Sequence, residues 1–231
     1  MHARGCSVGR AVTAHATGEK LVYLMRHGTT ELNVYLQTHQ WDAPDFVDPM
    51  LFDTRLTLRG VEGARAAAHE ASMLHPAPEL LVVSPLARAL QTATLAFLPH
   101  YSGPVMVEAL ARERVYMSGD CGSVRSRLQA EFPRFQLDHL PDIWWWTGGS
   151  DDPRAISLEP EEVFAERIEQ FRRWLLQRPE SVIAVVAHWG VIMQLTGHDF
   201  ENCELRSYCL HPDKPQLQPL ARQREGEPSV M

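Results

Sequence analysis

The stretch LVYLMRHG at residues 21–28 joins a continuous apolar run directly to an arginine, a histidine and a glycine. An apolar run of strand length without polar alternation is typical of a strand that is buried on both faces of a sheet. Two further runs of the same kind follow later in the chain, LLVV at 80–83 and VIAVV at 182–186. The three runs predict strands of one mainly parallel sheet, with shorter candidate strands at 105–107 and, at an edge, at 206–210.

Helical patterns lie between these runs. Residues 57–74 carry small and apolar side chains at helical spacing, and Thr57 is placed to cap the N-terminus. Residues 85–97 begin with a proline at the first helical position, directly after Ser84 as the candidate N-cap, which is a favoured helix start. Residues 160–176 have an apolar face and predict a long amphipathic helix. Strands that alternate with helices predict an α/β fold, a three-layer sandwich in which helices flank a mainly parallel central sheet.

Two long segments lack a sustained hydrophobic period and are predicted loops, residues 40–52 and 143–157. The second contains Trp144, Trp145 and Trp146, which have two interpretations: an aromatic lid over a ligand, or packing of a long insertion onto the domain. Packing is favoured, because large aromatic side chains are buried in most proteins.

The patterns divide the chain into one domain between two polar ends. Residues 1–18 lack the apolar core of a secretory signal and are expected to be a disordered extension, with organelle targeting as the alternative. Residues 19–211 contain every predicted strand and helix. Residues 212–231 are polar, contain four prolines and are expected to be a disordered tail.

Composition excludes several classes of protein. The chain of 231 residues has 22 Lys and Arg against 29 Asp and Glu, a formal net charge of −7, which argues against a nucleic-acid partner. No run approaches the length of a membrane-spanning helix, so no membrane partner is expected. The four cysteines are scattered and form no C-x-x-C pair, which indicates a reducing compartment. A cytoplasmic protein is therefore expected, while its oligomeric state is left open.

Basic side chains follow the three predicted strands. Arg26 and His27 come directly after the first run, Arg88 follows the second closely, and His188 follows the third. Ligands of open α/β sheets bind at the carboxyl ends of the strands, so these groups should converge on one anion, with phosphate as the natural occupant. A neutral histidine is a nucleophile that can accept a phosphoryl group, and Gly28 would let the backbone approach the ligand closely.

The residues around His27 resemble the signature of the histidine phosphatase superfamily, which contains cofactor-dependent phosphoglycerate mutases and many phosphatases. The resemblance covers about residues 20–211 and implies that His27 becomes phosphorylated, while Asn33 and Thr57 contact phosphate. Four segments match in order: LMRHGTTELN at 24–33, RLTLRG at 55–60, SPLARALQTA at 84–93 and VVAH at 185–188.

The resemblance also implies a glutamate as proton donor after the third strand. Glu113 is the best match and Glu108 is the competitor, which lies too near the strand to project over the pocket. A carboxyl beside a bound phosphate can keep a raised pKa and protonate the leaving oxygen. Arg114 follows in a segment that resembles the mutase pattern Glu-Arg-x-Tyr, and it is a candidate substrate ligand.

The expected function is metal-independent hydrolysis of a phosphate monoester through a phosphohistidine on His27. Glu113 is the expected proton donor, Arg26, Arg88 and His188 stabilise charge, and no cofactor is needed. The expected substrate is a small phosphorylated metabolite, and the sequence does not identify which one.

Three alternatives are weaker. Mutase chemistry is the first, although Met117 stands where the mutase pattern has a glycine. A non-catalytic phosphate-binding or scaffold protein is the second, although such a protein has no chemical reason to keep the whole set of residues. Cys121 and Arg127 have the Cys-x5-Arg spacing of cysteine-dependent phosphatases, but no apolar strand precedes the cysteine.

Overall fold

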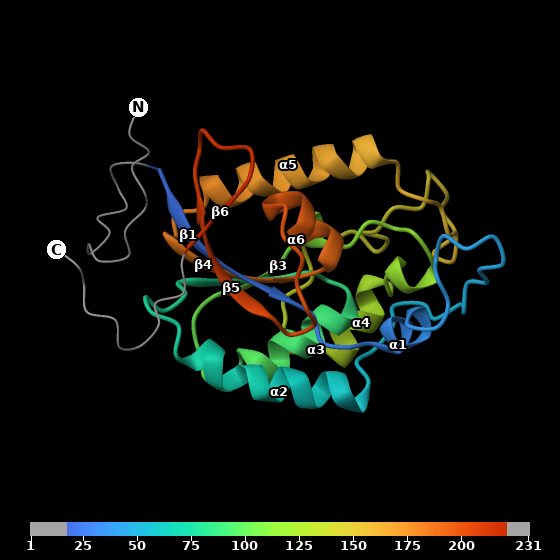
Figure 1. The fold of residues 1–231 in the computed structure, drawn as a ribbon, viewed down its shortest axis with the longest axis horizontal. Coiled ribbons are helices and arrows are strands. Elements are labelled where there is room, and N and C mark those ends of the chain that lie inside the picture. Colours follow the sequence, from blue (N-terminus) through green and yellow to red (C-terminus); the bar gives the residue numbers. More distant parts are fainter. Residues whose placement is uncertain (1–17, 221–231) are drawn as a thin grey trace.

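Six strands form the central sheet of the structure, a computed structural model that describes residues 18–220 (Figure 1). The strands are β1 (Lys20–Arg26), β2 (Leu80–Val83), β3 (Val105–Val107), β4 (Val182–Ala187), β5 (Leu205–Leu210) and β6 (Gln218–Pro219). Their order across the sheet is β3-β2-β4-β1-β5-β6. The pairs β3–β2, β2–β4 and β4–β1 are parallel, while β5 and β6 are antiparallel to their neighbours. The predicted mainly parallel sheet is confirmed.

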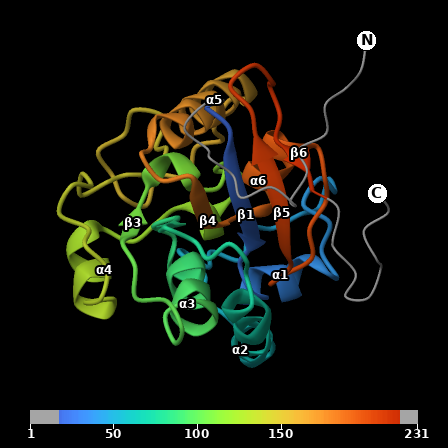
Figure 2. The same ribbon diagram turned by 90° about the vertical axis from the view of Figure 1, so that its left-hand side faces the viewer.

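Helices cover both faces of the sheet (Figures 1 and 2). On one face lie α2 (Leu58–Ser72) and α3 (Ala87–Ala96), and on the other lie α5 (Glu161–Gln177) and α6 (Trp189–Thr196). Shorter elements complete the chain: α1 (Glu31–Leu36), α4 (Arg125–Glu131), and the 3-10 helices η1 (Ala109–Ala111) and η2 (Ser118–Asp120). The fold is the expected three-layer α/β sandwich. Within residues 18–220, no helix is long and apolar enough to cross a membrane.

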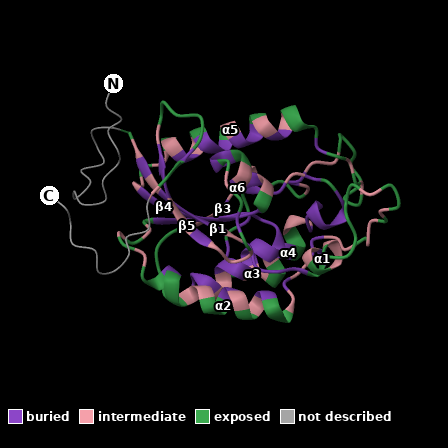
Figure 3. Cartoon of the chain, viewed as in Figure 1, coloured by how far each residue is buried: buried purple, intermediate pink, exposed green. Residues whose placement is uncertain are grey.

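Burial on both faces explains why the strands are continuous apolar runs. Tyr23 and Met25 of β1 pack into the cluster beneath α2 and α3, while Val22 and Leu24 pack into the cluster beneath α5 and α6. Figure 3 shows the strands buried between the two helical layers. Side chains of successive strand residues point to opposite faces, so both sets must be apolar here.

The end of the chain differs from the prediction. Residues 212–220 were expected to be disordered, yet they contain β6, and Leu217 is buried in the cluster beneath α5 and α6. Because β6 pairs with β5, the strand predicted at 206–210 is not an edge strand of the sheet. Residues 1–17 and 221–231, where disorder was also expected, lie outside the described residues.

The start of α3 also differs from the prediction. The helix begins at Ala87 behind Leu86, and no side chain of Leu86 caps it. Ser84 does not cap α3, because its hydroxyl oxygen accepts from the N–H of Leu86 and contacts the ring of His188. Asp53 caps the helix instead: its Oδ1 accepts from the backbone N–H of Ala87 at 2.9 Å. A carboxylate at a helix N-terminus satisfies an unpaired donor and the helix dipole.

The three consecutive tryptophans pack against the domain, as favoured above. Trp144 and Trp145 are buried in the cluster beneath α2 and α3, and Trp146 packs against that cluster. The indole N–H of Trp144 donates to the carbonyl of Ser123 at 3.0 Å. Their segment, residues 143–157, and the segment 40–52 contain no helix or strand, as expected.

Candidate active site

A cavity of about 240 Å³ lies beyond the carboxyl end of β1. Five of the residues predicted for the site line it: Arg26, His27, Asn33, Arg88 and Glu113. Three segments that are distant in the sequence therefore converge, and the register of the strands places His188 beside them. Arg26 pairs with Ala187 across β1 and β4, so the residues that follow them, His27 and His188, leave the sheet side by side.

His27 is buried and held in one orientation. Its backbone N–H donates to the carbonyl of Ala187 at 3.0 Å, and its ring Nδ1 lies 2.8 Å from the carbonyl oxygen of Gly28. A carbonyl oxygen can only accept, so the ring proton lies on Nδ1 and the lone pair on Nε2. Burial lowers the pKa of His27 well below its usual value, and the charges of Arg88 and Arg26 lower it further. The ring is therefore neutral and able to act as a nucleophile.

His188 lies behind the cavity. Its ring centroid is 5.1 Å from that of His27, but the side chain is completely buried and does not line the cavity. The Nε of Arg88 donates to its Nδ1 at 3.2 Å, and its Nε2 donates to the Ser84 hydroxyl oxygen at 2.6 Å. Both ring nitrogens are thus occupied. Through these contacts the ring orients Arg88 from behind the cavity.

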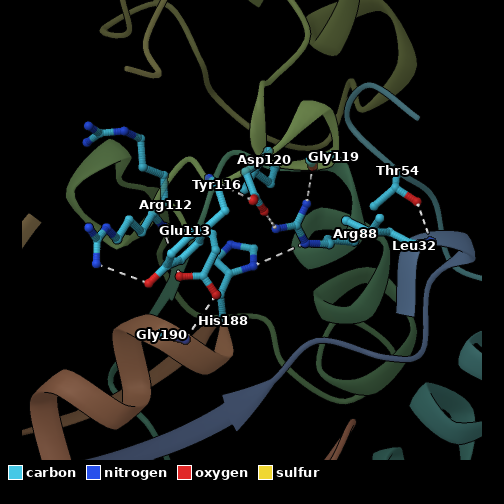
Figure 4. A network of polar contacts seen from close by, with 12 residues as sticks. Leu32, Thr54, Arg88, Arg112, Glu113, Tyr116, Gly119, Asp120, His188 and Gly190 are labelled. Carbon is cyan, nitrogen blue, oxygen red and sulfur yellow. Dashed lines mark hydrogen bonds and ion pairs between the residues drawn. The ribbon is translucent and has the colours of Figure 1, made fainter. Parts of the chain in front are cut away.

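Arg88 is held by three partners in a buried network (Figure 4). Besides His188, its Nη1 donates to the carbonyl of Gly119 at 2.6 Å and its Nη2 to Oδ1 of Asp120 at 2.9 Å. Burial raises the pKa of Asp120, while the Arg88 charge opposes that rise. The network fixes the guanidinium plane toward the cavity before any ligand arrives.

Arg26 supplies the second guanidinium. Its Nη1 donates to the carbonyl of Phe200 at 2.6 Å, and its Nε is buried without a hydrogen-bond partner among the described residues. Buried N–H donors of this kind are uncommon unless a ligand completes them. Arg26 and Arg88 together can bind the oxygens of one phosphoryl group.

Glu113 lines the cavity, and the pKa of its carboxyl is raised. Burial raises its pKa, and the nearby Asp120 raises it further, against hydrogen bonds from the backbone N–H groups of Gly190 and Arg114. These N–H groups lie 2.9 Å from Oε2 and Oε1 respectively. Glu108 instead caps η1 through the N–H of Leu110 and does not line the cavity. The choice of Glu113 over Glu108 agrees with the geometry.

A buried ionic cluster supports the segment that carries Glu113. Glu159 is fully buried and accepts from Arg112 at 2.7 Å and from Nε and Nη2 of Arg167 at 3.0 and 2.9 Å. Arg167 also donates through Nη1 to the carbonyls of Leu110 and Arg112, each at 2.8 Å. The cluster thereby ties α5 to the backbone beside Glu113.

Replacing Glu159 with glutamine is expected to lower the free energy of unfolding by about 3–5 kcal/mol, because two buried guanidiniums lose their counter-charge. Urea denaturation measures the change. Glu162→Gln, an exposed glutamate in the first turn of α5, is the matched control and should stay within about 0.5 kcal/mol of the native protein. Equal stability of the two variants would contradict the role assigned to the cluster.

Three predicted binding residues have other roles. Gly28 is needed for packing, because a Cβ there would lie 2.7 Å from the carbonyl oxygen of Gly60. Thr57 caps α2 by accepting from the N–H of Gly60 and does not line the cavity. Arg114 also lies outside the lining, and its Nε donates to the carbonyl of Glu159 at 2.8 Å. None of the three is among the residues that line the cavity.

Asn33 lines the cavity, although its side chain also belongs to the fold. Its Oδ1 accepts from the N–H of Thr30 at 3.1 Å and so completes the capping box of α1. The side-chain amide of Asn202 donates to the carbonyl of His27 at 2.9 Å and approaches Oδ1 of Asn33 at 3.4 Å. Asn202 thus links the β5 side of the sheet to the two predicted residues.

Several contributors to the site were not predicted. Asp53 and Asp120 act through Ala87 and Arg88, and no local sequence pattern indicates partners 34 and 32 residues away. The aromatic part of the lining was also missed: Trp41, Tyr116 and Trp189. Trp189 directly follows His188, and Tyr116 ends the segment that resembles the mutase pattern, so both positions beside the predicted site were available signals.

The cysteine alternative does not fit the structure. Cys121 is completely buried, and its thiol donates to the carbonyl of Ala155 at 3.8 Å. Burial raises the pKa of Cys121 to about 12, whereas a nucleophilic thiolate requires a lowered pKa. Cys121 does not line the cavity that contains His27.

Comparison with known proteins places the chain in a family. Phosphoglycerate mutase-like protein 1 of Arabidopsis thaliana is 29% identical over 237 aligned residues, covering 81% of this chain and 80% of that protein. Two solved structures share the fold. A mycobacterial glucosyl-3-phosphoglycerate phosphatase has 22% identity, a TM-score of 0.52 and coverage of 82% of this chain and 92% of its own. A protein called mycobacterial hydrolase 1 has 21% identity, a TM-score of 0.52 and coverage of 83% and 92%.

The sequence profile of the histidine phosphatase superfamily (branch 1) matches residues 22–211. That span includes every cavity-lining residue named above and all strands except β6, with only the first two residues of β1 outside it. The chain belongs to the histidine phosphatase superfamily, branch 1.

Proposed function

We propose that the protein hydrolyses phosphate monoesters of small metabolites through a covalent phosphohistidine on His27. The observation that carries this proposal is the arrangement of a neutral His27, two fixed guanidiniums and a carboxyl with a raised pKa around one cavity. Family membership and the phosphatase among the structural neighbours support the reaction class.

In the first step, Nε2 of His27 attacks phosphorus while the bond to the leaving oxygen breaks. Arg26 and Arg88 stabilise the charge on the remaining phosphoryl oxygens, and His188 keeps Arg88 in place. The proton of Glu113 passes to the leaving oxygen, which departs as a neutral alcohol. The hydrogen bond of Nδ1 to the Gly28 carbonyl stabilises the positive charge that develops on the ring.

In the second step, water attacks the phosphohistidine and the bond between nitrogen and phosphorus breaks. The Glu113 carboxylate accepts a proton from the water, inorganic phosphate leaves, and His27 returns to its neutral form. The same two guanidiniums stabilise the phosphoryl oxygens again. Their positive charges stabilise the negative charge of the transition state, which a metal ion does in other phosphoryl-transfer sites. The proposed reaction therefore needs no metal.

Hydrolysis is favoured over mutase chemistry by the position of Arg114. This residue belongs to the segment that resembles the mutase pattern, but its guanidinium stacks on the Tyr116 ring at 4.8 Å and lies outside the cavity lining. A mutase must retain an anionic intermediate for a second transfer, which calls for additional cations at the cavity. A purely binding role is disfavoured because it requires no raised pKa at Glu113.

The pH dependence follows from the pKa shifts of His27 and Glu113. The lowered pKa of His27 keeps the ring neutral through the weakly acidic range, and the raised pKa of Glu113 keeps its carboxyl protonated until the pH passes that value. For an alkyl phosphate, kcat is expected to be highest on the acidic side and to fall about tenfold per pH unit above the Glu113 pKa. A kcat that instead rises with a midpoint at the ordinary histidine pKa would contradict the neutral ring.

The reaction itself is tested by phosphate release in the presence of a metal chelator. Ethyl phosphate and 3-phosphoglycerate are assayed separately, the latter also with 2,3-bisphosphoglycerate as primer. Release of inorganic phosphate supports the hydrolase, and interconversion of phosphoglycerates without release would establish the mutase. Absence of both, together with tight binding of inorganic phosphate, would indicate a binding protein.

A further inference from the structure

The exposed part of the cavity wall is aromatic. Trp41, Tyr116 and Trp189 line the cavity although they are 57%, 37% and 41% exposed, whereas His27 and Arg88 are almost fully buried. The phosphate-binding groups therefore lie deep, and the three rings, called the aromatic rim below, lie where a bound phosphate ester would place its alcohol portion. Leu32, Leu36 and Met117 add apolar surface to the same lining.

The aromatic rim is held in place by specific contacts. The indole N–H of Trp189 donates to Oδ1 of Asp199 at 2.5 Å. The Arg114 guanidinium stacks on Tyr116 and donates to its hydroxyl oxygen at 3.1 Å. The Trp41 ring lies 5.7 Å from the Tyr116 ring, between centroids. Ordered aromatic rings that remain exposed together at a cavity are typical of ligand-binding surfaces, because burying them against another ring is favourable.

The charges of the lining exclude a second anionic group on the ligand. Among the described residues that line the cavity, the permanently charged cations are Arg26 and Arg88, and both are needed for one phosphoryl group. Two carboxyl groups, those of Glu113 and Asp120, also line it. A carboxylate or second phosphate on the alcohol portion would lie near these groups, and the Arg114 guanidinium beside the aromatic rim is already bonded to the Tyr116 hydroxyl oxygen and the Glu159 carbonyl.

We infer that the alcohol portion of the substrate is uncharged and carries a planar aromatic or heteroaromatic ring, which stacks within the aromatic rim. The inference rests on the proposed hydrolysis and adds its substrate class. Trp41, Tyr116 and Trp189 are then specificity-determining residues, which contact the leaving group and not the phosphoryl group. Such contacts raise kcat/KM for ring-bearing esters and leave the chemistry of simple esters unaffected.

Three phosphate monoesters test this inference: benzyl phosphate, ethyl phosphate and 3-phosphoglycerate. Benzyl and ethyl phosphate both release a neutral primary alcohol of similar basicity, so the proton transfer from Glu113 is comparable. The kcat/KM for benzyl phosphate is expected to exceed that for ethyl phosphate by at least about tenfold. The kcat/KM for 3-phosphoglycerate is expected to lie below that for ethyl phosphate as well, because 3-phosphoglycerate carries a carboxylate.

Variants of the aromatic rim separate stacking from a general effect on the fold. Trp41→Ala and Trp189→Ala should each lower kcat/KM for benzyl phosphate about five- to tenfold and change that for ethyl phosphate less than about twofold. Trp189→Phe, which retains a ring, should keep most of the preference. Leu58→Ala is the matched control, since Leu58 is an exposed apolar residue of α2 that does not line the cavity.

The outcomes distinguish the two proposals. Equal kcat/KM for benzyl and ethyl phosphate, or a preference for 3-phosphoglycerate, would overturn the inference while hydrolysis stands. Equal losses for benzyl and ethyl phosphate in the Trp41 and Trp189 variants would also overturn it. Failure of the native protein to hydrolyse any of the three esters would overturn the proposed hydrolysis and the inference together.

Discussion

Replacing His27 with alanine is expected to lower kcat/KM for every phosphate monoester by at least about 10⁴-fold, because the covalent intermediate loses the atom that carries it. Arg26 and Arg88 would still bind phosphate beside the vacated ring position. Affinity for inorganic phosphate should therefore fall much less than the rate. The measurements are phosphate release and equilibrium phosphate binding on the same preparation.

The covalent intermediate itself can be observed. Phosphohistidine is labile in acid and stable in base, so quenching the native protein in alkali with labelled substrate should leave label on the chain. His27→Ala should retain none, and the control His69→Ala, an exposed histidine of α2, should retain as much as the native protein. Label that persists in the His27 variant would assign the nucleophile to another residue.

Replacing Glu113 with glutamine is expected to lower kcat for alkyl phosphates by about 10²- to 10⁴-fold, because the leaving alkoxide receives no proton. The loss should shrink to about tenfold or less for p-nitrophenyl phosphate, whose phenolate leaves without protonation. The amide also cannot titrate, so the decline of kcat on the alkaline side should disappear. Rates for both substrates across the pH range measure the two effects together.

Glu108→Gln is the matched control for this variant. Glu108 is the other glutamate near the end of β3, but its carboxylate caps η1 and does not line the cavity. Its replacement should leave the dependence on leaving group unchanged. If Glu108→Gln showed the selective loss with alkyl phosphates and Glu113→Gln did not, the proton donor would have to be reassigned.

The elements that could be predicted from sequence are those whose pattern reflects local burial. The strands at 21–25, 80–83 and 182–186 are apolar throughout because helices cover both faces, and this environment leaves a readable pattern. Residues 212–220 were misjudged for the same reason. They are mostly polar and contain one buried apolar residue, Leu217. It packs beside α6 and directly precedes β6.

The site was predictable where residues follow strand ends and much less so where a polar group can serve two purposes. Thr57 caps α2 by accepting from the N–H of Gly60, and the local sequence of a capping threonine is the same as that of a threonine that binds phosphate. Arg88 was identified from its position, but Asp120, which fixes its guanidinium, depends on a contact between distant segments. Such contacts are set by the packed fold, and short-range periodicity carries no information about them.

The central position of β1 makes the site around His27 depend on segments that are synthesised much later than β1. β1 contains Arg26 and precedes His27, yet its two neighbours in the sheet are β4, at residues 182–187, and β5, at 205–210. A growing chain emerges from its N-terminus first, so β1 has neither of its sheet partners until residues 182–210 have been synthesised. A chain that ends before residue 182 therefore contains His27 but lacks β4, His188 and β5, which hold the site together.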